Sequence, residues 1–308
     1  MSAPAISIII PTKDRPAVFN RTITAALEAA KSVGAEILVI NDSKTSQPQL
    51  PFNDGSIRLI NNPKSGVAAA RNLGVANARA ELLLFVDDDI VFTSAHLSYT
   101  LDFLKQNDKA CLNLNWVYPP ELLKACQETA FGRFMIANHL VSLKGWRRGE
   151  IWHDALFEVD SGASCFLGIS RKNFQSCQGY NEAFPHSGFE DFEFNSRMRA
   201  QGIKIFIEAR QTVYHNEADK LDLQVWLKRN YHGAITTRIG FEMGFTQFEN
   251  KTRPVKRFFY RLISPFEPVL QFSLKVLPNT KMLDAIAFRI IHLLLGIALF
   301  KGYFIAKR

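Results

Sequence analysis

The sequence predicts an α/β fold, in which a mostly parallel sheet is flanked by helices and is followed by a helical C-terminal tail. Short apolar runs alternate with segments of helical length up to residue 89, which is typical of strand–helix–strand units with helical crossovers. The run Leu82–Val86 is apolar throughout, as expected for a strand buried on both faces. Polar or acidic residues follow several runs, which indicates that these strands end at one edge of the sheet.

The first half of the chain is divided by turn-forming residues. Pro11 ends the first apolar run, Gly34 stops the first helical segment, and the polar residues 43–56 read as a loop. The predicted elements are, in order, a strand over residues 5–10, a helix over 17–32, strands over 36–40 and 57–60, a helix from residue 65 or 66 to 80, the strand 82–86, a helix over 95–106 and a strand over 110–117.

The second half has weaker periodicity. Mixed helical spacing covers residues 121–143, and a polar stretch over 144–154 is predicted to be a loop. The further predicted elements are a strand-like run that ends at residue 169, a helix that opens at 188–191 and runs to 200, a strand over 203–207, a final sheet segment over 213–215 and a helix over 221–239.

The strand Leu82–Val86 ends in three consecutive carboxylates, Asp87, Asp88 and Asp89. An unpaired carboxylate is costly to bury, so the strand has to reach the carboxyl edge of the sheet here, where open α/β sheets bind ligands. Alternate residues of an extended chain point to the same side, so Asp87 and Asp89 can face one ligand. Two carboxylates, together with substrate phosphates, suit Mg²⁺ or Mn²⁺. An acidic turn without a ligand is the alternative interpretation.

Two earlier strand ends are also polar. Thr12 and Asp14 follow the first apolar run, and Asn41 and Asp42 follow the second. Since the carboxyl ends of parallel strands meet at one edge, acids from three strands gather there. One acid can accept a hydrogen bond from a base N–H and another from a ribose hydroxyl. These strand ends therefore predict a nucleotide pocket.

Composition narrows the class of protein. The 308 residues can form one large domain or two, and 47% of them are hydrophobic. Residues 251–308 hold eleven Lys or Arg and two acids, about +9, so the total charge of +8 leaves the rest near neutral. This distribution argues against nucleic-acid binding by the part of the chain before the tail. It indicates that the tail contacts an anionic surface. Four scattered cysteines and the lack of a basic, apolar leader predict a reduced, cytoplasmic protein.

In order and spacing, six short segments together resemble the family 2 glycosyltransferases of the GT-A fold. A second-half pattern, G-x-[ED]-D after N-E-x-F, also resembles the galactosyltransferase-type carboxyl module. The resemblance covers roughly residues 3–217, so we expect a catalytic domain over 1–217 and a basic helical tail over 218–308. The segments are Ser-Ile-Ile-Ile-Pro-Thr (7–12), Val-Ile-Asn-Asp (39–42), Gly-Val-Ala-Ala-Ala-Arg-Asn (66–72), Phe-Val-Asp-Asp-Asp (85–89), Gly-Tyr-Asn-Glu-Ala-Phe (179–184) and Gly-Phe-Glu-Asp (188–191).

The resemblance implies an inverting transfer of a sugar from a nucleotide-diphosphate sugar, with UDP-sugars favoured. The acceptor would be a hydroxyl of a glycan or lipid-linked molecule in polysaccharide or glycoconjugate assembly. The donor site implied by the resemblance consists of Pro11, Thr12 and Asp42 at the nucleotide base, Asp14 and Arg15 beside them, Arg71 near the diphosphate or orienting Asp87, Asp87 at the ribose or sugar, and Asp88 next to it.

The resemblance also implies a metal and a base. Asp89 and His215 would bind Mn²⁺ or Mg²⁺, which stabilises the departing diphosphate as a Lewis acid; a lone His is otherwise more often structural. Asp191 would accept the proton as the acceptor oxygen attacks the anomeric carbon. Glu190 would orient the acceptor or the helix start. Acids in the first turn of a helix are otherwise often capping residues.

Other activities remain open. A polyprenyl-phosphate sugar transferase is the alternative within the same chemistry, and a nucleotidyltransferase or a non-catalytic sugar-nucleotide-binding subunit is the alternative from another class. Residues 11–16 lack the Gly-rich loop that cradles a triphosphate, which disfavours a nucleotidyltransferase. The Q-x-x-R-W pattern of processive synthases is not convincingly reproduced after Asp191, which favours transfer of a single sugar.

The tail is predicted to lie in the membrane interface, at the cytoplasmic face of the inner or plasma membrane. Lys256, Arg257 and Arg261 are interleaved with aromatic residues, as in interfacial helices. The stretch 285–300, which is apolar except for Arg289 and His292, is about 16 residues long, short of the roughly 20 that span a bilayer. A core-packing helix, a homo-oligomer contact and a tilted spanning helix are the alternatives.

Two further features suggest contacts with substrate. The stretch 144–154 contains Trp146, Arg147 and Trp152, so it is predicted to lie over the site and bind an acceptor sugar or its phosphate. A surface loop pinned by its tryptophans is the alternative. Gly162 is expected to allow close backbone approach to a substrate.

Overall fold

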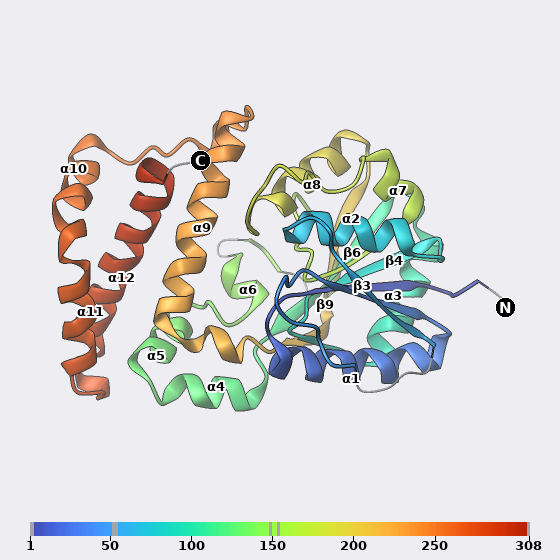
Figure 1. Ribbon diagram of the computed structural model, residues 1–308, viewed down its shortest axis with the longest axis horizontal. Coiled ribbons are helices and arrows are strands. Elements are labelled where there is room, and N and C mark those ends of the chain that lie inside the picture. Colours follow the sequence, from blue (N-terminus) through green and yellow to red (C-terminus); the bar gives the residue numbers. More distant parts are fainter. Residues whose placement is uncertain (1–2, 51–54, 148–149, 153–154, 307–308) are drawn as a thin grey trace. The chain divides into compact units, whose positions relative to one another are not determined.

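The fold is that of a computed structural model, which describes residues 3–50, 55–147, 150–152 and 155–306. The chain divides into two compact units (Figure 1). Unit 1 contains the sheet and unit 2 is helical. The predicted α/β fold is therefore confirmed. Unit 1 comprises Met1–Pro119, Ser142–Pro185 and Glu190–Asn216, and unit 2 comprises Pro120–Val141, His186–Phe189 and Glu217–Arg308.

Unit 1 is built on one sheet, in which the described residues form nine strands in the order β3-β2-β1-β4-β8-β6-β9-β5, with β7 paired to β9. The four strands from β3 to β4 are parallel, whereas β8 runs antiparallel to both of its neighbours. The strands are β1 (Ser7–Thr12), β2 (Glu36–Asn41), β3 (Ile57–Asn61), β4 (Leu82–Val86), β5 (Ile90–Val91), β6 (Ala110–Val117), β7 (Leu156–Val159), β8 (Phe166–Ser170) and β9 (Lys204–His215).

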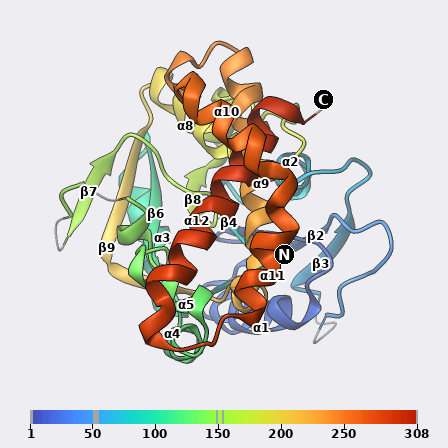
Figure 2. The ribbon, with the colours of Figure 1, turned by 90° about the vertical axis from the view of Figure 1, so that its left-hand side faces the viewer.

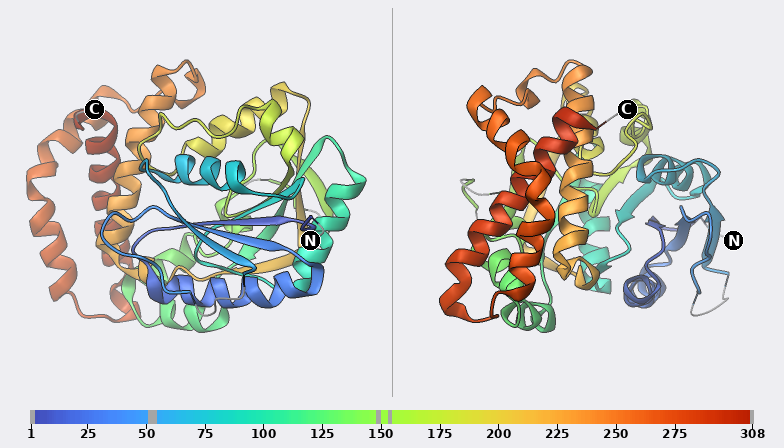
Figure 3. Two further views of the ribbon diagram at one scale, coloured as in Figure 1. Left: turned by 45° about the vertical axis from the view of Figure 1, so that its right-hand side comes forward. Right: turned by 60° about the vertical axis from the view of Figure 1, so that its left-hand side comes forward.

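Helices cover both faces of this sheet (Figure 3), with α2 on one face and α1 and α3 on the other. α1 begins at Pro16, whose fixed φ suits a first helical residue, and it is capped by Gly34 at φ 68°. The helices of unit 1 are α1 (Pro16–Val33), α2 (Val67–Asn77), α3 (Ser94–Gln106), α6 (Leu143–Trp146), α7 (Arg171–Ser176) and α8 (Glu190–Ala200).

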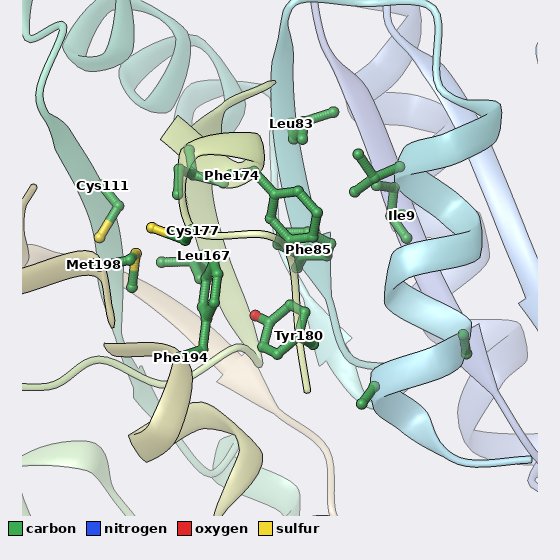
Figure 4. Packing of buried hydrophobic residues seen from close by; sticks show 14 of the residues in the cluster. Ile9, Leu83, Phe85, Cys111, Leu167, Phe174, Cys177, Tyr180, Phe194 and Met198 are labelled. Carbon is green, nitrogen blue, oxygen red and sulfur yellow. The ribbon is translucent and has the colours of Figure 1, made fainter. Parts of the chain in front are cut away.

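The core of unit 1 is rich in aromatic rings (Figure 4). Phe85 of β4 lies 5.5 Å, between ring centroids, from both Phe174 and Tyr180, and the ring of Phe194 on α8 lies 4.4 Å from that of Tyr180. Aromatic pairs at these separations add to the free energy of burying their area. The cluster fixes Tyr180 and the first turns of α8 against the strand that carries the acidic residues.

Strand pairing at the β5 end of the sheet brings together two segments that are distant in the sequence. β5 pairs antiparallel with the end of β9, so that Ile90 lies opposite His215, and the N–H of Asn216 donates to the carbonyl of Asp89 at 2.7 Å. Residues 203–207 and 213–215, predicted as separate segments, belong to one strand whose register against β6 shifts between Leu114 and Asn115. This pairing places the end of β9 beside the acidic end of β4.

Several predicted boundaries differ from the structure. β1 continues through Pro11 to Thr12, because Pro11 keeps an extended backbone in register with β2. α2 ends at Asn77 rather than at residue 80, since Ala78 is already extended. The region 121–143 contains two short helices, and part of the predicted loop 144–154 is the helical turn α6. β7 and α7 were not predicted.

Unit 2 is a set of helices around α12 (Figure 2). One face of α12 packs on α9 and α5, where Ile291, Leu294 and Ala298 contact Phe134 and Trp226. The elements of unit 2 are α4 (Pro120–Gln127), α5 (Ala130–Ala137), α9 (Leu223–Glu242), α10 (Pro254–Ile263), α11 (Glu267–Val276) and α12 (Asp284–Phe300), with short 3₁₀ turns η1 (Ala218–Leu221), η2 (Thr246–Phe248), η3 (Ser264–Phe266) and η4 (Lys281–Leu283) and the π turn η5 (Lys301–Ile305).

The last helical segment is longer than the sequence predicted. With its flanking turns it covers Lys281–Ile305, 25 residues. By length and composition alone, it is the one helical stretch among the described residues that could cross a membrane. Its packing against α9 and α5 nevertheless makes it part of the core of unit 2.

Candidate active site

Arg71 of α2 holds three carboxylates at the edge of the sheet. Its Nη2 lies 2.9 Å from Oδ1 of Asp87, and its Nη1 lies 3.2 Å from Oε1 of Glu190 and 3.4 Å from Oδ1 of Asp191. The guanidinium is buried and sits over the ring of Tyr180, 5.2 Å from its centroid. Burial lowers the pKa of Arg71, but the charges of Asp87 and Asp191 outweigh it and raise the pKa well above its usual value. The cation is therefore permanent.

The three carboxylates around Arg71 differ in exposure. The side chains of Asp87 and Asp191 are 34% and 26% exposed, whereas that of Glu190 is 2% exposed. Asp87 and Asp191 can therefore reach a bound molecule, and Glu190 serves to hold Arg71. That Glu190 orients the acceptor or the helix start stays a prediction.

Asp191 is fixed by the loop before β8. The backbone N–H of Ser164 donates to its Oδ2 at 3.2 Å, and the Ser164 hydroxyl donates to its Oδ1. Ser164 is also hydrogen-bonded to the hydroxyl of Tyr180, whose pKa is raised by burial. Ser164 could not be recognised from the sequence, because a lone serine before a strand carries no distinguishing signal. The acid is thus held in one orientation by neutral donors and a cation.

Asp88 and Asp89 form a second cluster with Arg15. Nη1 of Arg15 lies 2.5 Å from Oδ1 of Asp88, and its Nη2 lies 2.8 Å from Oδ2 of Asp89. Thr12 donates to Oδ2 of Asp88 at 2.7 Å. Burial raises the pKa of Asp88 to about 6, although the charge of Arg15 lowers it. Three residues that were predicted to bind the donor are thus linked, because Thr12 and Arg15 both donate hydrogen bonds to Asp88.

Asp89 also meets the end of β9. Nε2 of His215 lies 3.0 Å from its Oδ1, and both side chains are buried. The rings of Trp116 and Tyr118 stand edge-on to the imidazole, which fixes its plane. A buried carboxylate oxygen beside an imidazole nitrogen is a donor set that fits Mn²⁺, which accepts both ligand types. The predicted pair is therefore brought together, and Glu217, two residues beyond His215 and also buried, extends the acidic character of this segment.

The first two strand ends lie in a separate group. Asp42 is buried and accepts hydrogen bonds from the Asn62 side chain at 2.7 Å and from the N–H of Gly66 at 3.1 Å, and Lys13 lies 3.4 Å from it. Hydrogen bonds from Ser43 and Ser46 lower the pKa of the exposed Asp14. Pro11 lies buried within β1. Asp42 thereby ties the end of β2 to Gly66, the residue that precedes α2.

The stretch predicted to bind an acceptor is partly held by its own contacts. Arg147 pairs with Glu150 at 2.6 Å and donates to the carbonyl of Ser161 at 2.7 Å. Residues 148–149 and 153–154, which include Arg148, Gly149 and His153, lie outside the described residues. Gly162 meets protein rather than open space, because a Cβ there would lie 1.8 Å from Oδ1 of Asn113. Close packing on Asn113, and not an approach to a substrate, therefore explains the glycine at position 162.

Comparison with known proteins identifies the N-terminal part of the chain. Residues 7–141 match the model of the family "Glycosyl transferase family 2". The chain is 35% identical over 113 residues to an uncharacterized glycosyltransferase of Rickettsia conorii, covering 33% of this chain and 18% of that protein. It is 32% identical over 134 residues to the putative colanic acid biosynthesis glycosyl transferase WcaA of Escherichia coli, covering 39% and 48%. The chain thus spans less than half of each relative.

Two solved structures share the fold. The mannosyltransferase PcManGT from Pyrobaculum calidifontis, in complex with GDP-Man and Mn²⁺, aligns with a TM-score of 0.54 at 12% identity over 99% of this chain and 89% of its own. GalNAc-T7, with UDP, GalNAc and Mn²⁺, aligns with a TM-score of 0.52 at 14% identity over 68% and 42%. These likenesses show that the chain shares the fold of these two structures, and residues 7–141 match the family 2 glycosyltransferase model.

Proposed function

We propose that this chain is a metal-dependent enzyme that transfers a sugar, with inversion, from a nucleotide-diphosphate sugar to a hydroxyl group. The observation that carries the proposal is the pair of partly exposed carboxylates, Asp87 and Asp191, that one buried arginine holds at the sheet edge. The family 2 match over residues 7–141 supports the class of reaction.

The proposed base is Asp191. It accepts the proton of the acceptor hydroxyl while that oxygen bonds to the anomeric carbon and the bond from this carbon to the diphosphate oxygen breaks. One base on the acceptor side is sufficient for a single in-line displacement. Ser164 and Arg71 keep Asp191 ordered before substrate arrives, and such preorganisation lowers the cost of reaching the transition state.

A divalent cation would be held by Asp89 and His215, whose Oδ1 and Nε2 atoms lie 3.0 Å apart. When bound, the ion supplies Lewis-acid stabilisation of the diphosphate. Arg15 then neutralises the remaining charge of Asp88 and Asp89. Both structural neighbours were solved with Mn²⁺, which supports manganese as the metal.

We assign the nucleotide base to the region of Pro11, Thr12 and Asp42, with Asp14 and Arg15 beside it. Asp42 is held by Asn62 and by the turn before α2, which keeps a carboxylate in place at the end of β2. The neighbours carry UDP in one case and GDP-Man in the other. UDP-sugars remain our first expectation, on the resemblance alone.

The acceptor is proposed to be a glycan or lipid-linked hydroxyl in polysaccharide assembly, as the name of the colanic acid relative suggests. The second candidate is a polyprenyl phosphate as acceptor, which the basic tail favours. We place the enzyme at the cytoplasmic face of a membrane. The four cysteines are all buried and unbridged, as expected in a reducing compartment.

The test is Asp191→Asn, with Asp102→Asn on the exposed face of α3 as a matched control. We expect Asp191→Asn to lower transfer by at least about a thousandfold, since proton removal and its orientation are both lost. Donor binding, measured by thermal shift with Mn²⁺ across UDP-, GDP- and dTDP-sugars, should remain. Normal turnover of Asp191→Asn would show that another group is the base.

A further inference from the structure

The outer sides of α10 and α11 carry a row of large apolar side chains that nothing in the described part of the chain covers. We call this row the α10–α11 apolar face. Its members are 44–81% exposed, far more than an apolar side chain in a core. Surface patches of this kind mark interaction sites in soluble proteins. The face consists of Val255, Phe258, Phe259, Leu262, Phe266, Val269, Phe272 and Val276.

Helical geometry makes this a single continuous surface. Val255, Phe258, Phe259 and Leu262 follow the spacing i, i+3, i+4, i+7, which places them along one side of α10. The short turn η3 joins α10 directly to α11, where the members recur at intervals of three and four residues. Figure 1 shows α10 and α11 following one another end to end alongside α12.

The inner sides of the same helices are occupied. Tyr260 stacks on Phe300 of α12 at 6.3 Å between centroids, and its ring fills the space beside Gly296. Leu270 and Leu274 of α11 pack on the cluster around α12. One side of α10 and α11 therefore packs on the rest of unit 2, and the other side faces solvent. The apolar side chains of the α10–α11 apolar face are therefore exposed on folded helices, whose opposite sides pack on unit 2.

Basic residues border the apolar face. At 100° per residue, Lys256 and Arg261 fall on its two flanks, and Lys256 lies over the Tyr260 ring at 5.7 Å. Long basic side chains in this position can extend to lipid headgroups while their stems stay apolar.

The charge of the segment is not balanced by its own acids. Glu267 pairs with Lys301 at 2.5 Å, and Asp284 pairs with Arg133 of α5 at 2.6 Å. The other basic residues therefore leave the sequence 251–308 with an excess of positive charge. Two copies of this chain meeting through the face would oppose like charges, whereas an anionic surface would complement them.

We propose that the α10–α11 apolar face inserts into the interface of an anionic lipid bilayer, with Lys256 and Arg261 at the headgroups. This inference rests on the proposed membrane association and names the surface responsible for it. It differs from the expectation that residues 285–300 lie in the interface, because α12 uses Ile291, Leu294 and Ala298 for the core of unit 2. Within the tail, the membrane contact is thereby assigned to α10 and α11 and not to α12.

The test is flotation of the full-length protein with vesicles of phosphatidylcholine alone or mixed with phosphatidylglycerol. We expect binding to the mixed vesicles only, weakening as salt rises. The double variant Phe258→Asp/Phe272→Asp should lower the partition coefficient at least about a hundredfold. Val225→Asp, at an exposed apolar position of α9, is the matched control and should change it less than about twofold.

The charge contribution is measured separately. Lys256→Gln and Arg261→Gln should each lower binding to the mixed vesicles about fivefold and flatten its salt dependence. In Leu262→Trp, brominated lipids should quench the added fluorescence, since the face would lie near the acyl chains. Circular dichroism of each variant confirms that the fold is retained.

Two outcomes would overturn the proposal. One is equal flotation of the wild type and the Phe258→Asp/Phe272→Asp variant. The other combines two results: the wild type does not bind vesicles, and in lipid-free buffer it sediments as a stable dimer, whereas the double variant sediments as a monomer. The α10–α11 apolar face would then bind a second copy of the chain. Neither measurement needs a sugar donor, so the result is independent of whether Asp191 is the base.

Discussion

Arg71 illustrates how a few residues set the chemistry of the site. One buried guanidinium lies within 3.4 Å of the oxygens of Asp87, Glu190 and Asp191. Because the cation cannot lose its proton, it compensates the repulsion among these acids at every physiological pH. The side chains of Asp87 and Asp191 consequently remain partly exposed, whereas that of Glu190 is buried against Arg71.

Ser164 is expected to act as a positioning residue for Asp191. Ser164→Ala removes the hydroxyl donor to Oδ1 but keeps the backbone donor to Oδ2. We expect kcat to fall about tenfold with little change in the KM for the donor, whereas Ser176→Ala, at an exposed serine of α7, should have no effect. A rise in KM at unchanged kcat would show that Ser164 contributes to donor binding instead.

His215 offers a test of the proposed metal site. His215→Ala removes the imidazole that lies 3.0 Å from Asp89. The dissociation constant for Mn²⁺, measured by calorimetry or electron paramagnetic resonance without any substrate, should rise at least about tenfold. An unchanged affinity would place the ion elsewhere.

At the scale of elements, a buried acid ties together the opposite edge of the sheet. Glu36, at the start of β2, accepts from Ser7 of β1 at 2.6 Å and from the Nε of Arg79 at 2.9 Å, and Nη2 of Arg58 on β3 lies 3.0 Å away. Burial raises the pKa of Glu36, but these hydrogen bonds and the charge of Arg58 outweigh it, so the pKa is lowered. This network holds three neighbouring strands in register.

Glu36→Gln is expected to lower the free energy of unfolding by about 2–4 kcal/mol at neutral pH, because the amide presents N–H donors to other donors. The native pKa is lowered, so the carboxylate stabilises the fold above its ordinary pKa near 4.5 and the contribution disappears as the pH falls through the native value. Urea unfolding across this range measures the effect, with exposed Glu28→Gln of α1 as the control. A difference independent of pH would contradict the assignment.

At the scale of the whole molecule, the chain contains two compact units, and each has its own hydrophobic cluster. In unit 2 this cluster depends on α12, which contributes Ile291, Leu294 and Ala298. Deleting the tail would expose Trp226 and Phe134 together with the rest of the cluster. If a protein without the tail failed to bind membranes, unfolding of unit 2 would explain the loss. Point substitutions on the α10–α11 apolar face therefore test membrane binding more directly.

Leu294→Ala is expected to destabilise unit 2 by about 2–5 kcal/mol, because it leaves a cavity beside the core. Leu299→Ala on the same helix, at an exposed position, is the matched control and should cost well under half as much. Urea unfolding followed by tryptophan fluorescence measures both, since Trp226 lies in the cluster. Equal losses for the two variants would contradict the packing of α12.

Much of the fold follows from local rules that a sequence displays. A fully apolar run must be buried, a charge must reach the surface, and proline and glycine limit helices at predictable places, so β4, α1 and the acidic end at Asp87–Asp89 could be recognised directly. The family resemblance added the order of the segments and the residues that are expected to bind the nucleotide. Register shifts, β7 and the exact helix ends could not be predicted, because partner strands rather than local preferences determine them.

The sequence by itself determined the α/β class, the acidic strand end and the positive charge of the tail, because each depends on residues that are neighbours along the chain. Only the tertiary structure brought His215 to Asp89, through the pairing of β5 with β9, and placed Ser164 against Asp191. It also decided which apolar residues of the tail are core and which are surface. An apolar helix in a core and one at a membrane obey the same burial preference, so only the neighbours that α12 finds distinguish them.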